Sequence, residues 1–296
     1  VHVWAGSPEE PLSIHASHLH HGAGVNRAAF SRDSTRLVTA GNDGKARVWA
    51  CETGQPGATF DHGADVRCAQ FDVTGAVALT AGADGVVKQW DTATGRAARP
   101  DVKHGKDVLW AAYSPDGDRL VTAGTGMAKL WNAKTGEPVG PPFHAGADVV
   151  LYAEFSPDGK RIVTAGGDNF ARQWAITPAG ARPTGRDMPH TEDVLAARFN
   201  ATGTRIATGS ADGTARIWDT DGNPLGQSMW HNSVVNDVAF SPDGTAVITS
   251  SDDNTARVWD AATGLPRGPR LAHCGAVNRA VFSPSSKYVL TGSQAG

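Results

Sequence analysis

Val77–Asp91 reads VALTAGADGVVKQWD, and this stretch decides the fold. It contains a short apolar alternation, an Asp-Gly turn, a second short run and a closing Trp-Asp pair. Alternation with a period of two is typical of a half-buried β-strand, and Asp-Gly favours a tight hairpin turn. The stretch therefore predicts two short antiparallel strands joined by a hairpin.

Close copies of this stretch recur along the chain, as RLVTAGNDGKARVWA (36–50), RIVTAGGDNFARQWA (161–175), RIATGSADGTARIWD (205–219) and AVITSSDDNTARVWD (246–260). Seven tryptophans keep a common phase, at spacings of 41 to 45 residues: Trp4, Trp49, Trp90, Trp131, Trp174, Trp218 and Trp259. A fixed period of this length indicates repeated structural units. Turn sequences such as Ser-Pro-Asp-Gly and Thr-Gly separate the alternating runs, so each unit reads as four short antiparallel strands.

The repeat resembles the WD40 family, whose fold is a β-propeller, typically of seven blades. The resemblance covers essentially the whole chain. A histidine stands at the family's Gly-His position in every unit: His21, His62, His104, His144, His190, His231 and His273. Trp-Asp itself is kept only at 90–91, 218–219 and 259–260. The resemblance implies an all-β, seven-bladed β-propeller of four-stranded antiparallel blades.

We expect one propeller domain over residues 1–296. The expected blades span about 22–61, 62–103, 104–143, 144–189, 190–230 and 231–272, with a composite blade made of 273–296 plus 1–21. The composite blade is expected because the chain begins shortly before Trp4 and ends after two strands' worth of sequence. Pairing of the two ends would close the ring and remove two open sheet edges. The abrupt start and stop also suggest an excised or trimmed chain.

Most units combine a histidine, a threonine, an aspartate and a tryptophan at fixed spacing. The sets are His21/Thr39/Asp43/Trp49, His62/Thr80/Asp84/Trp90, His144/Thr164/Asp168/Trp174, His190/Thr208/Asp212/Trp218 and His231/Thr249/Asp253/Trp259. An acid, a base and a hydroxyl could suggest catalysis, but a catalytic site needs one asymmetric constellation. In WD40 relatives these residue types form a hydrogen-bonded chain within the blade, and their donors and acceptors suit that role. We therefore predict a structural network and no catalytic residues.

Two units depart from this pattern. The third, AGTGMAKLW at 123–131, is one residue short and has no aspartate, and Ala295 fills the aspartate position of the composite unit. His104 and His273 must then find water or another acceptor. His15, His18 and His20 form a loose tract with His21 that could suggest a metal site, but no partner has suitable spacing. We expect no metal and no cofactor.

By the same resemblance, partners dock on the face that carries the loop before each first strand and the aspartate turn. Candidate residues there form an amide-rich arc in three units: Asn26, Asn42, Asn236, Asp252, Asn278 and Gln294. The other units supply an apolar arc rimmed by acid: Arg67, Leu109, Trp110, Leu151, Leu195, Asp65, Asp107, Asp148 and Asp193. Exposed apolar side chains of this kind mark interaction sites. Alternatively, the leucines pack inside a central channel and the aspartates cap turns.

The composition narrows the possible partners and the compartment. The net charge of −3 and the absence of a Lys/Arg run argue against nucleic acid, and no run is long enough to cross a membrane. Three cysteines without metal-ligand spacing indicate free thiols in a reducing cytoplasm. We expect a monomeric, non-catalytic scaffold that binds a protein or peptide. The alternatives are a sensor or regulatory module of a larger bacterial protein, such as a kinase or nucleotide hydrolase, and a propeller enzyme.

Overall fold

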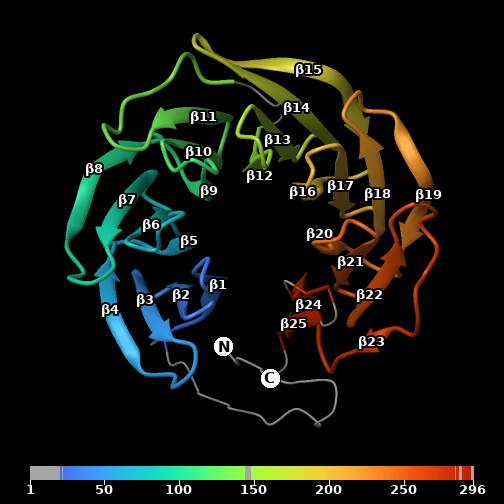
Figure 1. The fold of residues 1–296 in the computed structure, drawn as a ribbon, viewed down its shortest axis with the longest axis horizontal. Coiled ribbons are helices and arrows are strands. Elements are labelled where there is room, and N and C mark those ends of the chain that lie inside the picture. The colour runs from blue at the N-terminus through green and yellow to red at the C-terminus, as the bar shows by residue number, and fades with distance from the viewer. Residues whose placement is uncertain (1–20, 22, 144–147, 284, 287–288, 295–296) are drawn as a thin grey trace. The chain divides into compact units, whose positions relative to one another are not determined.

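The structure is a computed structural model that describes residues 21, 23–143, 148–283, 285–286 and 289–294. In these residues it contains β-strands and no helix, arranged as seven antiparallel sheets. The chain divides into two compact units, one of residues 1–125 and 129–139 and the other of 126–128 and 140–296. The prediction of an all-β chain with seven antiparallel sheets is confirmed (Figure 1).

The first two sheets belong to the first unit, and each has four strands in chain order. The first sheet consists of β1 (Val25–Phe30), β2 (Arg36–Gly41), β3 (Lys45–Ala50) and β4 (Pro56–Asp61). The second consists of β5 (Val66–Phe71), β6 (Val77–Gly82), β7 (Val86–Asp91) and β8 (Ala97–Lys103).

The third sheet has three strands: β9 (Val108–Tyr113), β10 (Arg119–Gly124) and β11 (Met127–Asn132). In place of a fourth strand, two isolated bridges join Ala128 to Phe143 and Trp131 to Pro138.

The second unit holds the remaining four sheets. The fourth sheet consists of β12 (Val150–Phe155), β13 (Arg161–Gly166), β14 (Phe170–Thr177) and β15 (Gly180–Pro189). The fifth consists of β16 (Val194–Phe199), β17 (Arg205–Ser210), β18 (Thr214–Asp219) and β19 (Pro224–Trp230). The sixth consists of β20 (Val235–Phe240), β21 (Ala246–Ser251), β22 (Thr255–Asp260) and β23 (Leu271–Ala272), and the seventh of β24 (Val277–Phe282) and β25 (Val289–Ser293).

Residues 1–20 of the expected composite blade lie outside the described residues, so the predicted pairing of the two chain ends stays a prediction. The proposed domain boundaries stay predictions.

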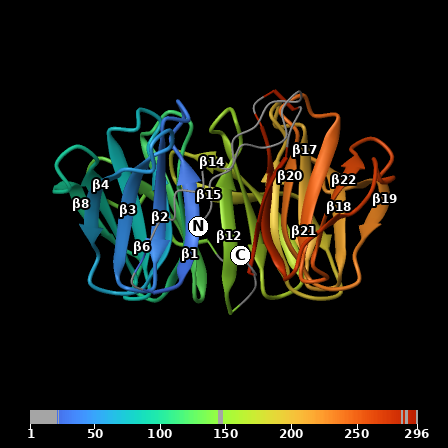
Figure 2. The same ribbon diagram turned by 90° about the horizontal axis from the view of Figure 1, so that it is seen from below.

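Tight turns connect the strands, and glycine makes the tightest of them possible. Gly85, in the turn between β6 and β7, has a φ of 79°, a conformation that glycine adopts without steric cost. At Gly82 the constraint is space, because a Cβ atom there would lie 2.2 Å from His62 Nε2. In each unit the strands run between loops at the two ends of the sheets, as the side view in Figure 2 shows.

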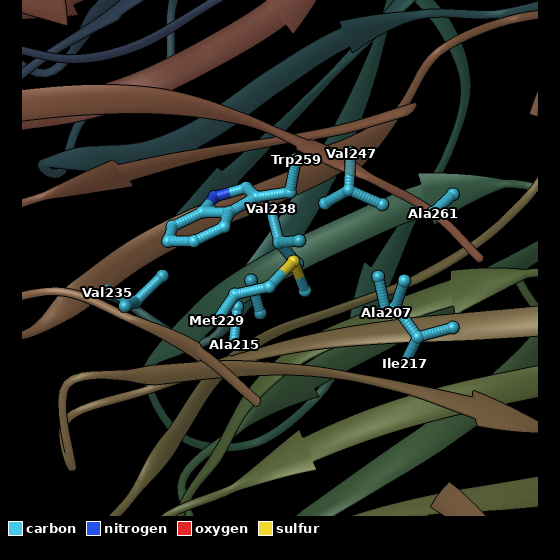
Figure 3. Close-up of a cluster of buried hydrophobic side chains, with 10 residues drawn as sticks. Ala207, Ala215, Ile217, Met229, Val235, Val238, Val247, Trp259 and Ala261 are labelled. Carbon is cyan, nitrogen blue, oxygen red and sulfur yellow. The ribbon is translucent and has the colours of Figure 1, made fainter. Parts of the chain in front are cut away.

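Apolar side chains fill the space between neighbouring sheets of the same unit. In the first unit, Val38 and Phe60 of the first sheet pack with Val66 and Phe71 of the second. In the second unit, Met229 of β19 packs with Val238 and Trp259 of the sixth sheet (Figure 3). The core is thus built between the faces of successive sheets.

Candidate functional site

The repeated His-Thr-Asp-Trp sets are assembled inside the sheets. In all six sheets that have the tryptophan in the described residues, its Nε1 donates to the threonine Oγ1 at 2.7–2.9 Å: Trp49–Thr39, Trp90–Thr80, Trp131–Thr122, Trp174–Thr164, Trp218–Thr208 and Trp259–Thr249. A ring nitrogen of the histidine lies 2.6–2.8 Å from the same oxygen in His21, His62, His104, His190, His231 and His273. His144 lies outside the described residues.

The second imidazole nitrogen meets the aspartate in four sheets. The distances between nitrogen and carboxylate oxygen are 3.3 Å for His21–Asp43, 3.2 Å for His62–Asp84, 3.0 Å for His190–Asp212 and 2.9 Å for His231–Asp253. In the fourth sheet Asp168 pairs with Arg172 at 2.7 Å.

Burial lowers the pKa of His62, His190 and His231, although the neighbouring carboxylates raise it. The rings are therefore neutral at pH 7, with the N–H given to aspartate and the other nitrogen accepting from threonine. In these three sheets the set is therefore a hydrogen-bonded structural chain.

Asp253→Ala is expected to lower the free energy of unfolding by about 1–3 kcal/mol, because His231 and Thr255 lose their shared acceptor in a buried place. Asp84→Ala is expected to cost less, since the Asp84 side chain is 34% exposed and that of Asp253 only 6%. Urea melts of the two variants and the unchanged protein test this order. Identical midpoints for all three would refute it.

The loop face is formed in each sheet by two positions that the backbone holds side by side. One is the second residue of the first strand, here called the bulge residue: Asn26, Arg67, Leu109, Leu151, Leu195, Asn236 and Asn278. In every sheet the register shifts at this residue, so it is the extra residue of a β-bulge. A bulge leaves its extra residue out of the ladder and re-aims the side chain.

The other position, here called the turn residue, precedes the aspartate in five sheets and has no aspartate after it in the third and seventh: Asn42, Ala83, Thr125, Gly167, Ala211, Asp252 and Gln294. Its backbone N–H donates, at 2.8–3.2 Å, to the carbonyl just before the first strand: Gly24, Asp65, Asp107, Val149, Asp193, Val234 and Ala276. This backbone hydrogen bond, here called the clamp, recurs in all seven sheets, whereas the side chains of the bulge and turn residues differ. The backbone carbonyls of Asp65, Asp107 and Asp193 serve this clamp.

The amide residues are hydrogen-bonded to one another within their sheets. Asn26 Nδ2 donates to Asn42 Oδ1 at 2.6 Å and to the Val66 carbonyl of the next sheet at 2.8 Å.

Asn236 repeats this arrangement, with Asp252 Oδ1 at 2.6 Å and the Val277 carbonyl at 3.1 Å. Gln294 Nε2 donates to Asn278 Oδ1 at 3.3 Å. Asn26 and Asn236 thus each donate one hydrogen bond within their own sheet and one to the next sheet.

The structure places the residues of the expected apolar arc in different environments. Leu109 in the first unit, and Leu151 and Leu195 in the second, are half-buried. Trp110 is only 2% exposed and stacks beneath the Arg27 guanidinium, 3.9 Å from the ring centroid, so it is not a surface anchor. The bulge explains this correction, because it turns Leu109 outward and leaves the next residue on the buried side.

The acidic rim differs between the two units. In the first unit, Asp107 Oδ1 lies 3.6 Å from Arg67 Nε, so two candidate residues pair with each other. In the second unit Asp148 is exposed and Asp193 half-buried, and within the described residues neither makes an ion pair.

A charged group on the first strands of the second unit was not anticipated. Arg198 of β16 donates to both carboxylate oxygens of Asp237 of β20, at 2.9 and 3.1 Å, and Arg279 of β24 donates to the same carboxylate at 3.3 Å. Next to it, Tyr152 OH donates to Glu154 Oε2 at 2.6 Å. The sequence signal was the presence of charges inside short alternating strands, where an apolar residue is usual.

Burial raises the pKa of Glu154, against the lowering effect of Arg198. For Arg198 burial lowers the pKa, but Asp237, Tyr152 and Glu154 together raise it above its usual value. These groups link consecutive sheets. No set of three or more His, Cys, Asp or Glu side chains in the described residues is placed to hold a metal ion.

The family profile described as WD domain, G-beta repeat matches the chain seven times, over residues 12–50, 54–91, 102–132, 142–175, 183–219, 222–260 and 269–296. The chain belongs to the WD40 family, and with seven matches and seven sheets the predicted β-propeller fold class is confirmed. A comparison with curated proteins found no match. WD40 domains are in general protein-interaction modules. No helix in the described part of the chain has the length and hydropathy of a membrane span.

Proposed function

We propose that the chain is a non-catalytic interaction platform that binds a protein or peptide on the loop face. The observation that carries the proposal is the contrast between the two kinds of position within one repeat. The His-Thr-Asp-Trp residues recur and satisfy one another, whereas the bulge and turn residues change from sheet to sheet on an identical backbone clamp. Specificity resides in what varies, because a partner can distinguish only unlike surfaces.

The second unit offers the better-defined chemistry for a partner. Leu151 and Leu195 occupy equivalent bulge positions on the first strands of two adjacent sheets, and both side chains are partly exposed. Asp148, Glu192 and Asp193 lie next to them in the sequence, and no cation pairs with these carboxylates within the described residues. An apolar anchor flanked by basic residues therefore complements this part of the face.

The platform is proposed as non-catalytic because its acids, bases and hydroxyls are committed to a repeated structural chain. We also propose a cytoplasmic monomer. None of Cys51, Cys68 and Cys274 forms a disulfide, which suits a reducing compartment.

Affinity capture with the intact chain as bait tests the proposal. The double variant Leu151→Asp with Leu195→Asp is expected to lose the captured partner, because two charges replace the apolar anchors. Leu265→Asp is the matched control: Leu265 is 52% exposed and lies in the loop after β22, at the opposite end of the sheet. Retention of the partner by the control and its loss by the double variant support the loop face. An unchanged set of partners for the double variant would overturn it.

A further inference from the structure

The third sheet contains a buried histidine that lacks one of its partners. His104 is 3% exposed, and its Nδ1 lies 2.8 Å from Thr122 Oγ1, as in the other sheets. Its Nε2 is fully buried and has no hydrogen-bond partner among the described residues. The equivalent nitrogen meets an aspartate in the first, second, fifth and sixth sheets, and the Leu271 carbonyl at 3.0 Å in the seventh.

The cause is visible in the sequence. The second sheet reads Gly-Ala-Asp-Gly-Val over 82–86, whereas the third reads Gly-Thr-Gly-Met over 124–127. The aspartate is missing and the turn is one residue shorter. A buried polar nitrogen without a partner is uncommon in folded proteins and calls for an explanation.

The same deletion removes a negative charge from the neighbourhood of a cation. Lys129 Nζ donates to the His104 carbonyl at 2.8 Å, as Lys88 Nζ does to the His62 carbonyl in the second sheet, where the aspartate is kept. In the first, fourth and fifth sheets the cation at this position pairs with the aspartate of its own sheet: Arg47–Asp43 at 2.7 Å, Arg172–Asp168 at 2.7 Å and Arg216–Asp212 at 3.8 Å. The third sheet therefore lacks one negative charge next to a nitrogen that can donate.

We propose that this position binds a carboxylate supplied by a ligand, which takes the place of the missing aspartate. The carboxylate accepts from His104 Nε2–H and faces the Lys129 ammonium group. In the second sheet, the Asp84 carboxylate that occupies the corresponding place is 34% exposed, so the position lies at the boundary with solvent. Because Nε2 itself is buried, binding requires local opening of the turn that follows Gly124. The carboxylate comes from a small organic acid or from an acidic side chain of a docked protein.

The test is NMR of the full-length chain with ¹⁵N-labelled histidine, titrated with sodium acetate and with the tripeptides acetyl-Gly-Asp-Gly-amide and acetyl-Gly-Asn-Gly-amide. Saturable shifts of the His104 ring nitrogens and a higher pKa of His104 are expected with a carboxylate, because the anion favours the protonated ring. Sodium chloride at equal ionic strength and the Asn peptide are expected to leave His104 unchanged. His62 and His190 serve as internal references.

Two variants make the result specific. An aspartate inserted between Thr125 and Gly126 restores the spacing of the other sheets and is expected to abolish the response, whereas an inserted alanine is the length control. Lys129→Gln is expected to weaken binding about tenfold through loss of the charge. A response to acetate and the Asp peptide alike indicates that a free carboxylate suffices, and a response to the peptide alone indicates a protein side chain. No response to either ligand, or an equal response in the aspartate-insertion variant, overturns the proposal.

Discussion

Asp237→Ala is expected to lower the free energy of unfolding by about 3 kcal/mol, the range found when one partner of a buried ion pair is removed. Asp237 is the only carboxylate among the described residues that contacts Arg198 within hydrogen-bonding distance, and it also accepts from Arg279. Its removal leaves the largely buried Arg198 guanidinium without its carboxylate and takes away the negative charge that Arg198 shares with Arg279. Both desolvation and repulsion then act against the folded state.

Loss of the Asp237 carboxylate should weaken the packing of three consecutive sheets of the second unit against one another. Arg198, Asp237 and Arg279 come from β16, β20 and β24, so the carboxylate joins strands that share no backbone hydrogen bond. The seventh sheet has only two strands in the described residues, and a two-stranded sheet depends on such packing for its stability. Amide exchange in β24 and β25 is therefore expected to accelerate more than exchange in β17 and β18.

Urea unfolding followed by tryptophan fluorescence measures the effect. Asp221→Ala is the control, because Asp221 is an exposed aspartate of the same unit whose side chain makes no ion pair within the described residues. The control is expected to match the unchanged protein within about 0.5 kcal/mol. Equal midpoints for Asp237→Ala and Asp221→Ala would show that the charged group contributes nothing.

The second large effect is a loss of stability between pH 6.5 and pH 4. Burial lowers the pKa of His62, His190 and His231, and burial together with the Lys129 charge lowers that of His104 to about 4. In the unfolded chain these rings titrate near 6.5. Below that pH the unfolded state binds more protons than the folded state, so acid favours unfolding.

The sign and the window follow from the same difference. The stability that the buried neutral histidines contribute is fully present above pH 6.5. It falls as the pH drops below 6.5 and levels off below the pKa of each histidine in the folded state. For His104 alone, a pKa lowered from 6.5 to about 4 corresponds to about 3 kcal/mol. The aspartates act at lower pH: although burial opposes it, hydrogen bonds from Thr214 and Thr191 lower the pKa of Asp212 to about 2. The stability that these aspartates contribute is lost only below about pH 4.

Urea midpoints at intervals from pH 7.5 to pH 4.5, at constant ionic strength, test this prediction. The midpoint should fall continuously from about pH 6.5, and NMR should show His104 still neutral at pH 5.5 in the folded protein. A midpoint that stays constant down to pH 4.5 would contradict the assignment of neutral, buried imidazoles.

The strands could be predicted well because each repeat contains its own apolar alternation and its own turn residues. The alternation on both sides of Asp84 corresponds to β6 and β7, and the turn between them stands at Gly85. The loop face was harder, because a bulge adds a residue without changing the apolar pattern around it. Trp110 was expected beside Leu109 on this face, but the structure buries it.

The charged group of Arg198, Asp237 and Arg279 was not predicted from the sequence, for a different reason. Its members come from three repeats, about 40 residues apart, and they meet only when first strands of neighbouring sheets pack together. Comparison of equivalent positions within the repeat shows that these residues differ, but it does not show which of them pair. For His104, in contrast, the loss of the aspartate partner was evident from the sequence alone, but the other protein acceptor expected in its place is not found among the described residues.

The affinity of a captured partner for two variants tests the central claim most directly, namely that the repeated residues hold the fold and the variable loop face binds. At a temperature where both variants are folded, calorimetry is expected to give an unchanged Kd for Asp253→Ala. For Leu151→Asp with Leu195→Asp, the Kd is expected to rise at least about tenfold, as for loss of interface anchors. The opposite pattern, weaker binding by Asp253→Ala and unchanged binding by the leucine variant, would contradict the account.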